Sequence, residues 1–220
     1  MRRLIVNADD LGYDPAIDRG ILEAHAGGLV SSATAMVDTP YAPAALAAAP
    51  ASLGIGLHAV LSPELDEAGA RAELCRQLAR FQALRGAPPT HLDSHKHAHA
   101  RPAILRAFAA EAGARRLPVR AITAEMRATL RGWGIVTADR FLGDAARRPA
   151  WTEASLAAAL AGLEDGVTEL MAHPGHPPTH ARTSFGAERE VELAALLSPR
   201  SRAALQGAGA VLCSYAQLGE

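Results

Sequence analysis

The chain has 220 residues, a formal net charge of −1 and 20% charged residues. This length suits one domain with a substantial core, and a charge near zero argues against nucleic acid or an anionic membrane as a partner. Cys75 and Cys213 are isolated, so no disulfide framework is expected. The apolar run near the N-terminus is too short for a signal-peptide core, and no stretch reaches transmembrane length. We therefore expect a cytoplasmic protein with no membrane partner.

Short apolar runs alternate with helical patterns along the chain. The first run predicts a strand, and the next segment predicts a helix with Asp14 as N-cap, Pro15 at its first position and Gly27 at its end. The predicted strands are 3–8, 29–37, 53–61, 90–95, 119–123, 167–173 and 210–215. The predicted helices are 15–27, 42–49, 66–85, 102–112, 151–164, 187–197 and 200–206. Residues 124–150 have no readable pattern.

Strands that alternate with helices at this spacing predict a parallel sheet and an α/β fold. About seven such units fit, slightly fewer than in a complete eight-stranded barrel. We therefore expect a distorted or incomplete (β/α) barrel of about seven parallel strands, with an open doubly wound sheet as the alternative. The chain has no internal repeat or linker, so residues 1–220 are interpreted as a single domain.

Acidic and imidazole side chains recur where the predicted strands end. They are Asp9 and Asp10, His58, Asp93 and His95, and His173. The carboxyl ends of parallel strands open on one face, where such folds build their sites. Imidazoles with a carboxylate suit Zn²⁺, Mn²⁺ or Fe²⁺, and three protein ligands with a position left for water would make the site catalytic.

The segment THLDSHKHAHA, residues 90–100, holds four of the nine histidines. If it were fully extended, His91 and His99 would lie ~26 Å apart at about 3.3 Å per residue, too far to bind one ion. His95, at the strand end, is the best candidate ligand. Asp93 is interpreted as a partner behind the ligands, while His97 and His99 are expected to line a substrate pocket. His91 is interpreted as structural.

Each of these residues also has a purely structural interpretation. DDLGYD fits a turn followed by a helix cap, and a lone strand histidine such as His58 is more often a hydrogen-bonded core residue. His176 and His180, in a proline-rich loop, are expected to be solvated. The pattern G-x-G-x-x-A at 54–59 lies inside an apolar run instead of at a strand-to-helix turn, which argues against a dinucleotide site. Four strand ends bearing Asp or His are nevertheless hard to obtain by chance.

Several motifs together resemble the YdjC-like carbohydrate deacetylases, which include chitooligosaccharide deacetylases. The resemblance is carried by LIVNADDLGYD and the residues after it, GIGLH, THLDSHKHAH, ELMAHPGH and EREVELAALLSP, and it spans nearly the whole chain. It implies an incomplete barrel and one divalent ion, Mg²⁺ or Zn²⁺, held by Asp10, His58 and His95. The distantly similar NodB-type deacetylases suggest Asp9 as general base and His173 as general acid.

The chain departs from the family pattern at three places. Leu11 stands where the family usually has Phe, and Ala59 and Val60 follow His58 where an Asn is common at the second position. The segment between His58 and His91 is short, so a substrate-capping insertion is expected to be missing. These departures concern the length and identity of the glycan, and they leave the expected metal site intact.

The combined expectation is a metal-dependent hydrolase that removes an acetyl group from an N-acetylated sugar or short oligosaccharide. Asn7, the only Asn in the chain, is assigned to substrate binding together with His97 and His99. The small N-acetylated carbohydrate is the expected partner, and a homodimer is a candidate assembly.

Two other functions remain open. One is a metal-dependent phosphoesterase or other amidohydrolase, which a second metal and basic residues placed for phosphate would favour. Lys96 and Arg101 are the only basic residues near the histidine cluster along the chain. The other is a non-catalytic metal- or glycan-binding protein, for which the ligands alone would suffice.

Overall fold

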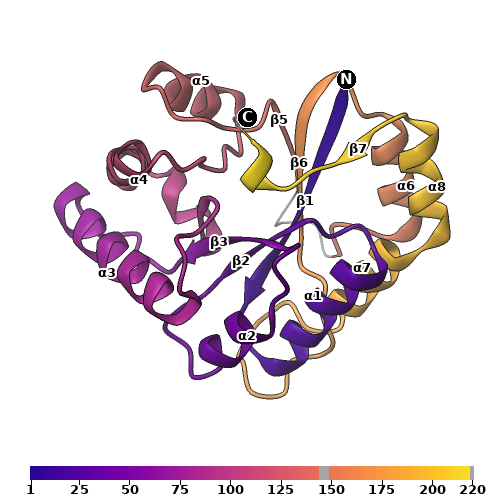
Figure 1. The fold of residues 1–220 in the computed structure, drawn as a ribbon, viewed down its shortest axis with the longest axis horizontal. Helices are drawn as coiled ribbons and strands as arrows, with labels where there is room; N and C mark the ends of the chain where they lie inside the picture. Colours follow the sequence, from indigo (N-terminus) through magenta and orange to yellow (C-terminus); the bar gives the residue numbers. More distant parts are fainter. Residues whose placement is uncertain (144–148, 219–220) are drawn as a thin grey trace.

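A computed structural model describes residues 1–143 and 149–218. Its described strands form one parallel sheet in the order β4-β3-β2-β1-β6-β5, with β7 also paired to β1. Figure 1 shows the strands gathered in the centre of the molecule with the helices around them. The strands are β1 (Arg2–Leu11), β2 (Ser32–Ala35), β3 (Gly54–Ala59), β4 (Leu92–Ser94), β5 (Arg140–Leu142), β6 (Gly166–Ala172) and β7 (Val211–Leu212).

The helices follow the predicted alternation closely, and side-chain caps begin several of them. Asp14, Asp66 and Thr123 each accept a hydrogen bond from a backbone N–H in the first turn of the next helix, which satisfies a donor that would otherwise lack a partner. The helices are α1 (Pro15–Gly27), α2 (Ala42–Ala48), α3 (Glu67–Arg85), α4 (Pro102–Arg115), α5 (Ala124–Gly132), α6 (Glu153–Ala161), α7 (Glu188–Leu197) and α8 (Pro199–Gly207). The 3₁₀ segments are His95–Ala100 and Tyr215–Gln217.

Strand β1 is the centre of the sheet. It pairs with β6 along its first seven residues, with β7 through Arg3 and Leu4, and with β2 nearer its carboxyl end. Every residue from Leu4 to Leu11 is buried, because helices surround the curled sheet and side chains from the strands fill the inside of such a barrel. The polar residues at the end of β1 are therefore held inside the protein by apolar neighbours on the same strand.

The predicted fold class is confirmed, since the sheet is a curled, incomplete barrel of parallel strands. One predicted strand is wrong, however. In 119–123 only Val119 forms a bridge, to Leu92, and Thr123 already caps α5, so the chain turns away before a ladder can form. The segment 124–150, which had no readable pattern, instead contributes α5 and β5. Within residues 1–143 and 149–218, the sheet order ends at β4 and β5, and no ladder closes the barrel between them.

The helices pack in neighbouring pairs around the outside, among them α3 with α4, α6 with α8 and α1 with α7. Their inner faces contribute fully buried side chains such as Ile17, Phe81 and Phe108 to one large core. Among the described residues, no helix is long and apolar enough to cross a membrane.

Candidate metal centre and active site

The two adjacent aspartates at the end of β1 both line one cavity. In a regular strand Asp9 and Asp10 would point to opposite faces. The pairing of β1 with β2 is interrupted between Ala8 and Leu11, and Asp10 has a left-handed backbone with a φ of 74°. Irregularities of this kind redirect side chains beside active sites. Here the irregularity lets neighbouring carboxylates reach the same site.

Asp10, His58 and His95 come together from three strand ends. Asp10 Oδ1 lies 3.4 Å from His58 Nε2 and 3.3 Å from His95 Nδ1, and the two imidazole nitrogens are 3.3 Å apart. Their donor atoms lie within 4.8 Å of one another. Among the described residues, Asp10 Oδ1 is buried and has no hydrogen-bond partner, which is costly for a carboxylate oxygen unless a cation satisfies it. One carboxylate and two imidazoles therefore fit a divalent ion.

Asp93 lies behind His58, as expected for a residue that orients a ligand. Its Oδ1 accepts a hydrogen bond of 2.7 Å from His58 Nδ1, so that Nε2 faces Asp10. Burial alone would lower the pKa of His58, but the charge and hydrogen bond of Asp93 and the charges of Asp9 and Asp10 together outweigh it, and the pKa is raised to about 9. A carboxylate in this position fixes the ring orientation and increases the basicity of a ligating histidine.

Asp9 is held quite differently, by the fully buried Arg120. Arg120 donates to both oxygens of Asp9 at 2.7 Å, and it also pairs with Asp93 and with Glu169 at 2.7 Å. Burial would raise the pKa of Asp9, but the charge and hydrogen bonds of Arg120, together with the charge of His58, outweigh it and the pKa is lowered. Asp9, His58 and Asp93 form a second group with metal-ligand spacing, yet its two carboxylates already bind a cation, which is Arg120.

His173 follows the end of β6 and faces Asp9 across the cavity. Its Nε2 lies 3.9 Å from Asp9 Oδ2, and its backbone N–H donates to the buried Glu192. The turn that follows packs directly on α1, since a Cβ added at Gly20 would lie 2.5 Å from the Cα of Gly175. This close packing fixes the position of the strand end that carries His173.

The histidine cluster divides where its backbone leaves the extended conformation. Lys96 and His97 have left-handed φ values of 55° and 53°, a conformation that costs about 1–3 kcal/mol per residue and often marks functional sites. His95, Lys96 and His97 all lie on the cavity wall. His99 instead lies fully buried, with Nδ1 2.6 Å from Ser94 Oγ and its ring stacked on Phe108.

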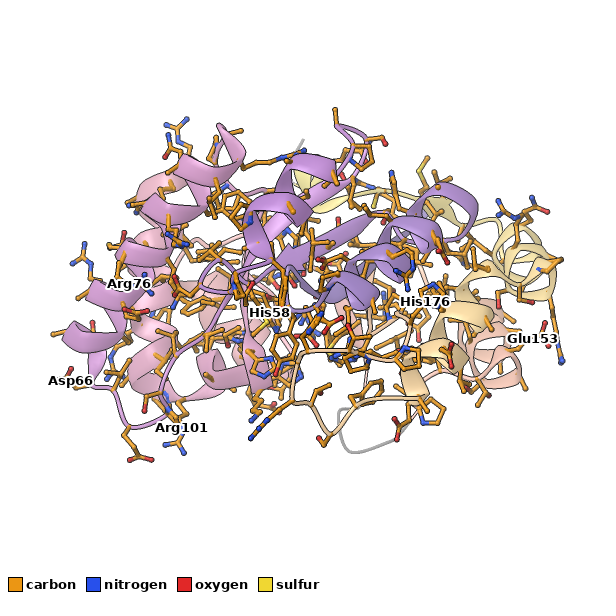
Figure 2. All side chains as sticks on the ribbon, turned by 90° about the horizontal axis from the view of Figure 1, so that it is seen from below. His58, Asp66, Arg76, Arg101, Glu153 and His176 are labelled. Carbon is orange, nitrogen blue, oxygen red and sulfur yellow. The ribbon has the colours of Figure 1, made fainter. Side chains whose placement is uncertain are left out.

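The cavity has a volume of about 180 Å³. Its walls come from the ends of β1, β3 and β6, from the segment after β4, and from the loop 182–185. In Figure 2, His58 lies near the middle of the molecule, whereas Asp66 and Arg76 lie at its outer edge. The metal-ligand candidates and the acid–base candidates thus share one internal site.

Two residues assigned to substrate binding are not on the cavity wall. They are His99, described above, and Asn7, and both are fully buried. The amide nitrogen of Asn7 donates to Asp9 at 2.8 Å, and its carbonyl oxygen lies 3.0 Å from Nε2 of the buried His91. Both are enclosed because they belong to the strand or turn behind the cavity, and they are placed to support Asp9 and the chain after β4. His97 does line the cavity.

The remaining loop histidines lie apart from the cavity. His176 Nε2 is 3.0 Å from Glu23, and the His180 ring stacks on Tyr41. In Figure 2, His176 lies well away from His58.

Sequence reasoning missed the arginines that organise the site. Lys96 and Arg101 are the basic residues nearest the histidine cluster along the chain. In space, however, it is Arg120 and Arg189 that contact the carboxylates of the site. Arg120 had one available signal, since a lone arginine in the apolar run VRAIT needs a buried acidic partner. Arg189 lies in a helical pattern in which arginine is common, and its role depended on where α7 packs.

Comparison with known proteins identifies the family. A family model described as "YdjC-like protein" matches residues 3–207. The chain belongs to the YdjC-like family. A carbohydrate deacetylase of Geobacillus stearothermophilus is 35% identical, with 97% of each chain covered. A chitooligosaccharide deacetylase of Serratia marcescens is also 35% identical, with 98% of each chain covered.

Solved structures share the fold of this YdjC-like chain. A crystal structure described as a candidate cellobiose-phosphate cleavage protein from Enterococcus faecalis superposes with a TM-score of 0.84 and 28% identity, covering 97% of each chain. A family 4 acetyl xylan esterase from Clostridium thermocellum, in complex with a cobalt ion, has a TM-score of 0.56 and 15% identity, over 97% of this chain and 88% of that one. The second similarity concerns the fold alone.

Proposed function

We propose that this YdjC-like protein is a metal-dependent carbohydrate deacetylase, which hydrolyses the acetamido group of an N-acetylated sugar or short oligosaccharide. The observation that carries the proposal is the meeting of an Asp-His-His donor set with an Asp–His pair in one cavity. The names of the two relatives that are 35% identical support the substrate class.

The first requirement of amide hydrolysis is an activated water. A divalent ion held by Asp10, His58 and His95, Mg²⁺ or Zn²⁺, would lower the pKa of a water and polarise the acyl carbonyl. Asp93 holds the His58 ring in its ligating orientation through a 2.7 Å hydrogen bond. Arg189 binds the second oxygen of Asp10 at 2.6 Å, which leaves Oδ1 as the ligand atom.

The proton transfers are assigned to Asp9 and His173. Asp9 is ionised because its pKa is lowered, so it accepts a proton from the water as the water oxygen bonds to the acyl carbon. His173 donates a proton to the amide nitrogen as the C–N bond breaks, and the products are acetate and a free amine. Asn7 and Arg120 hold the Asp9 carboxylate in place during these steps.

Two competing functions are weighed against this arrangement. A two-metal phosphoesterase needs a second cation among the carboxylates, and Arg120 already fills the second acidic group. A non-catalytic binding protein would need only the ligands, whereas Asp9 and His173 face each other on the cavity wall at 3.9 Å. The cavity, at about 180 Å³, is smaller than the pockets of about 300–1,000 Å³ that hold drug-sized ligands. A terminal or short glycan unit is therefore the expected substrate.

The decisive experiment is an acetate-release assay. Chelator-treated protein, with and without added Mg²⁺ or Zn²⁺, is incubated with N,N′-diacetylchitobiose, longer chito-oligomers and a phosphomonoester control. We expect acetate from a short N-acetylated glycan only when metal is present. Phosphate release without acetate from any glycan would instead support the phosphoesterase.

A further inference from the structure

Arg189, on α7, has one nitrogen that the described structure leaves without a partner. The side chain is 1% exposed. Its Nε donates to the Phe185 carbonyl at 2.9 Å and its Nη2 donates to Asp10 Oδ2 at 2.6 Å, while Nη1 is buried and unpaired. A buried donor left without a partner costs about 1–3 kcal/mol, and more when it belongs to a charged group. Such an orphan donor, on a side chain that lines a cavity, indicates a ligand that completes it.

The position of Arg189 restricts what that ligand can be. Arg189 lines the same cavity as Asp10 and His173. The Phe185 ring lies 5.6 Å from the guanidinium carbon of Arg189, and its centre is 5.0 Å from that of the His173 ring. Arg189 therefore lines the cavity where an amide must lie if Asp10 is a metal ligand and His173 protonates the leaving nitrogen, and its Nη1 is buried with no partner among the described residues.

We propose that Arg189 is a substrate-contacting residue, whose Nη1 donates a hydrogen bond to the acyl oxygen of the amide and then to the acetate product. Nη2 meanwhile keeps its bond to Asp10. This inference rests on the proposed deacetylase function. Negative charge develops on the acyl oxygen as water adds to the acyl carbon, and a permanently charged donor placed there before reaction stabilises that charge.

The competing interpretation is that Arg189 only positions Asp10. A lysine at this position separates the two, because its single ammonium group keeps a positive charge beside Asp10 but lacks the forked geometry that serves two acceptors at once. Arg189→Lys should therefore retain metal and lose the acyl contact. Arg189→Met removes both interactions and should weaken metal binding as well.

The test measures acetate binding separately from turnover. Wild type, Arg189→Lys and Arg189→Met are saturated with Zn²⁺, their zinc content is determined by elemental analysis, and sodium acetate is titrated by calorimetry. Loss of one charge-assisted hydrogen bond should weaken the acetate Kd of Arg189→Lys about 10- to 100-fold at full metal occupancy. Its kcat for acetate release should fall about 10²–10³-fold. Arg106→Met, in an exposed pair with Glu67, is the matched control and should bind acetate like wild type.

Wild-type acetate affinity and kcat in zinc-loaded Arg189→Lys would overturn the inference and leave only the positioning role. So would the absence of acetate binding by wild type. Failure of wild type to release acetate from any glycan would instead refute the deacetylase function, so the two failures are distinguishable. If neither variant folds by circular dichroism, a crystal structure of zinc-loaded wild type with acetate decides the question, because an acetate oxygen must lie within hydrogen-bond distance of Nη1.

Discussion

Asp9 and Asp10, at the end of β1, are adjacent in sequence, but their carboxylates have different partners. Both oxygens of Asp9 are bound by one guanidinium, that of Arg120. Asp10 gives one oxygen to Arg189 and turns the other toward two imidazoles. Asp9, with both oxygens bound by an arginine, keeps its charge and orientation but has no oxygen left for a metal ion. Asp10, with one oxygen not bound by an arginine, can bind one. Two identical side chains can therefore divide the roles of base and ligand.

The largest loss of activity is expected when one of the proposed metal ligands beside Asp10 is removed. His58→Ala or His95→Ala removes one of three donors, so we expect loss of stoichiometric metal and a fall in acetate release of at least about 10³-fold, since a catalytic metal supplies several kcal/mol. Elemental analysis after dialysis measures the first effect. His176→Ala, which removes a histidine paired with Glu23 outside the cavity, is the control. Full metal occupancy in both ligand variants would refute the assignment.

Replacing Asp9, whose two oxygens are both bound by Arg120, should lower the rate of acetate release without changing the metal content. Asp9→Asn removes the proton acceptor while Asp10, His58 and His95 stay in place, so we expect normal metal content and a fall in kcat of about 10²–10⁴-fold. Asp165→Asn, whose side chain is 80% exposed, provides the comparison. Near-normal turnover by Asp9→Asn would show that Asp9 is not the base.

Arg120 should matter most for folding. Arg120→Met leaves Asp9, Asp93 and Glu169 buried without their shared cation. Breaking a buried ion pair in this way costs about 3–5 kcal/mol in the free energy of unfolding. Urea unfolding measures it, with Arg106→Met as an exposed-pair control expected within about 0.5 kcal/mol of wild type. A loss no larger than that of the control would mean that the buried network is dispensable.

A third carboxylate, Asp18, sharpens the comparison because it has no arginine partner in the described part of the chain. It accepts a hydrogen bond from the Gly12 N–H just beyond Asp10. Burial raises its pKa from 3.8 to about 7, so the folded state holds a proton that the unfolded state releases. Its favourable contribution to stability is complete below about pH 4 and is lost as the pH rises through about 7.

Asp18→Asn removes the cost of burying an ionised carboxylate at high pH, and its side-chain oxygen can still accept the hydrogen bond from the Gly12 N–H. We compare the free energy of unfolding of the variant with that of wild type at each pH. This difference should favour the variant by about 1–3 kcal/mol more at pH 8 than at pH 4. Chemical unfolding at a series of pH values measures this difference, and Asp165→Asn should show no comparable trend. A constant difference between Asp18→Asn and wild type across this range would contradict the raised pKa.

Local sequence patterns sufficed for most of the fold. Apolar runs of strand length and helix caps such as Asp14 predicted the order of the elements, and they failed where local signals are weak. Residues 119–123 have strand-like composition, but Thr123 begins α5 before a ladder forms. The short β5 was not predicted, because three residues with little alternation carry almost no periodic signal.

The prediction of the site shows the same limit. The rule that parallel strand ends share one face was enough to select Asp10, His58 and His95, which the structure brings together. The same rule could not tell which neighbouring residues face the cavity. Asn7 and His99 were assigned to the substrate, but both are enclosed behind it.

By itself, the sequence determined the family, the parallel α/β architecture and the strand ends where acidic and imidazole side chains meet, because these depend on periodicity and motifs within short segments. Only the tertiary structure decided how the two aspartates differ. Arg120 is 111 residues from Asp9, and Arg189 is 179 residues from Asp10. Charges so far apart along the chain pair only after the sheet has curled and α7 has packed, and that pairing leaves one carboxylate oxygen of Asp10 open to a metal ion.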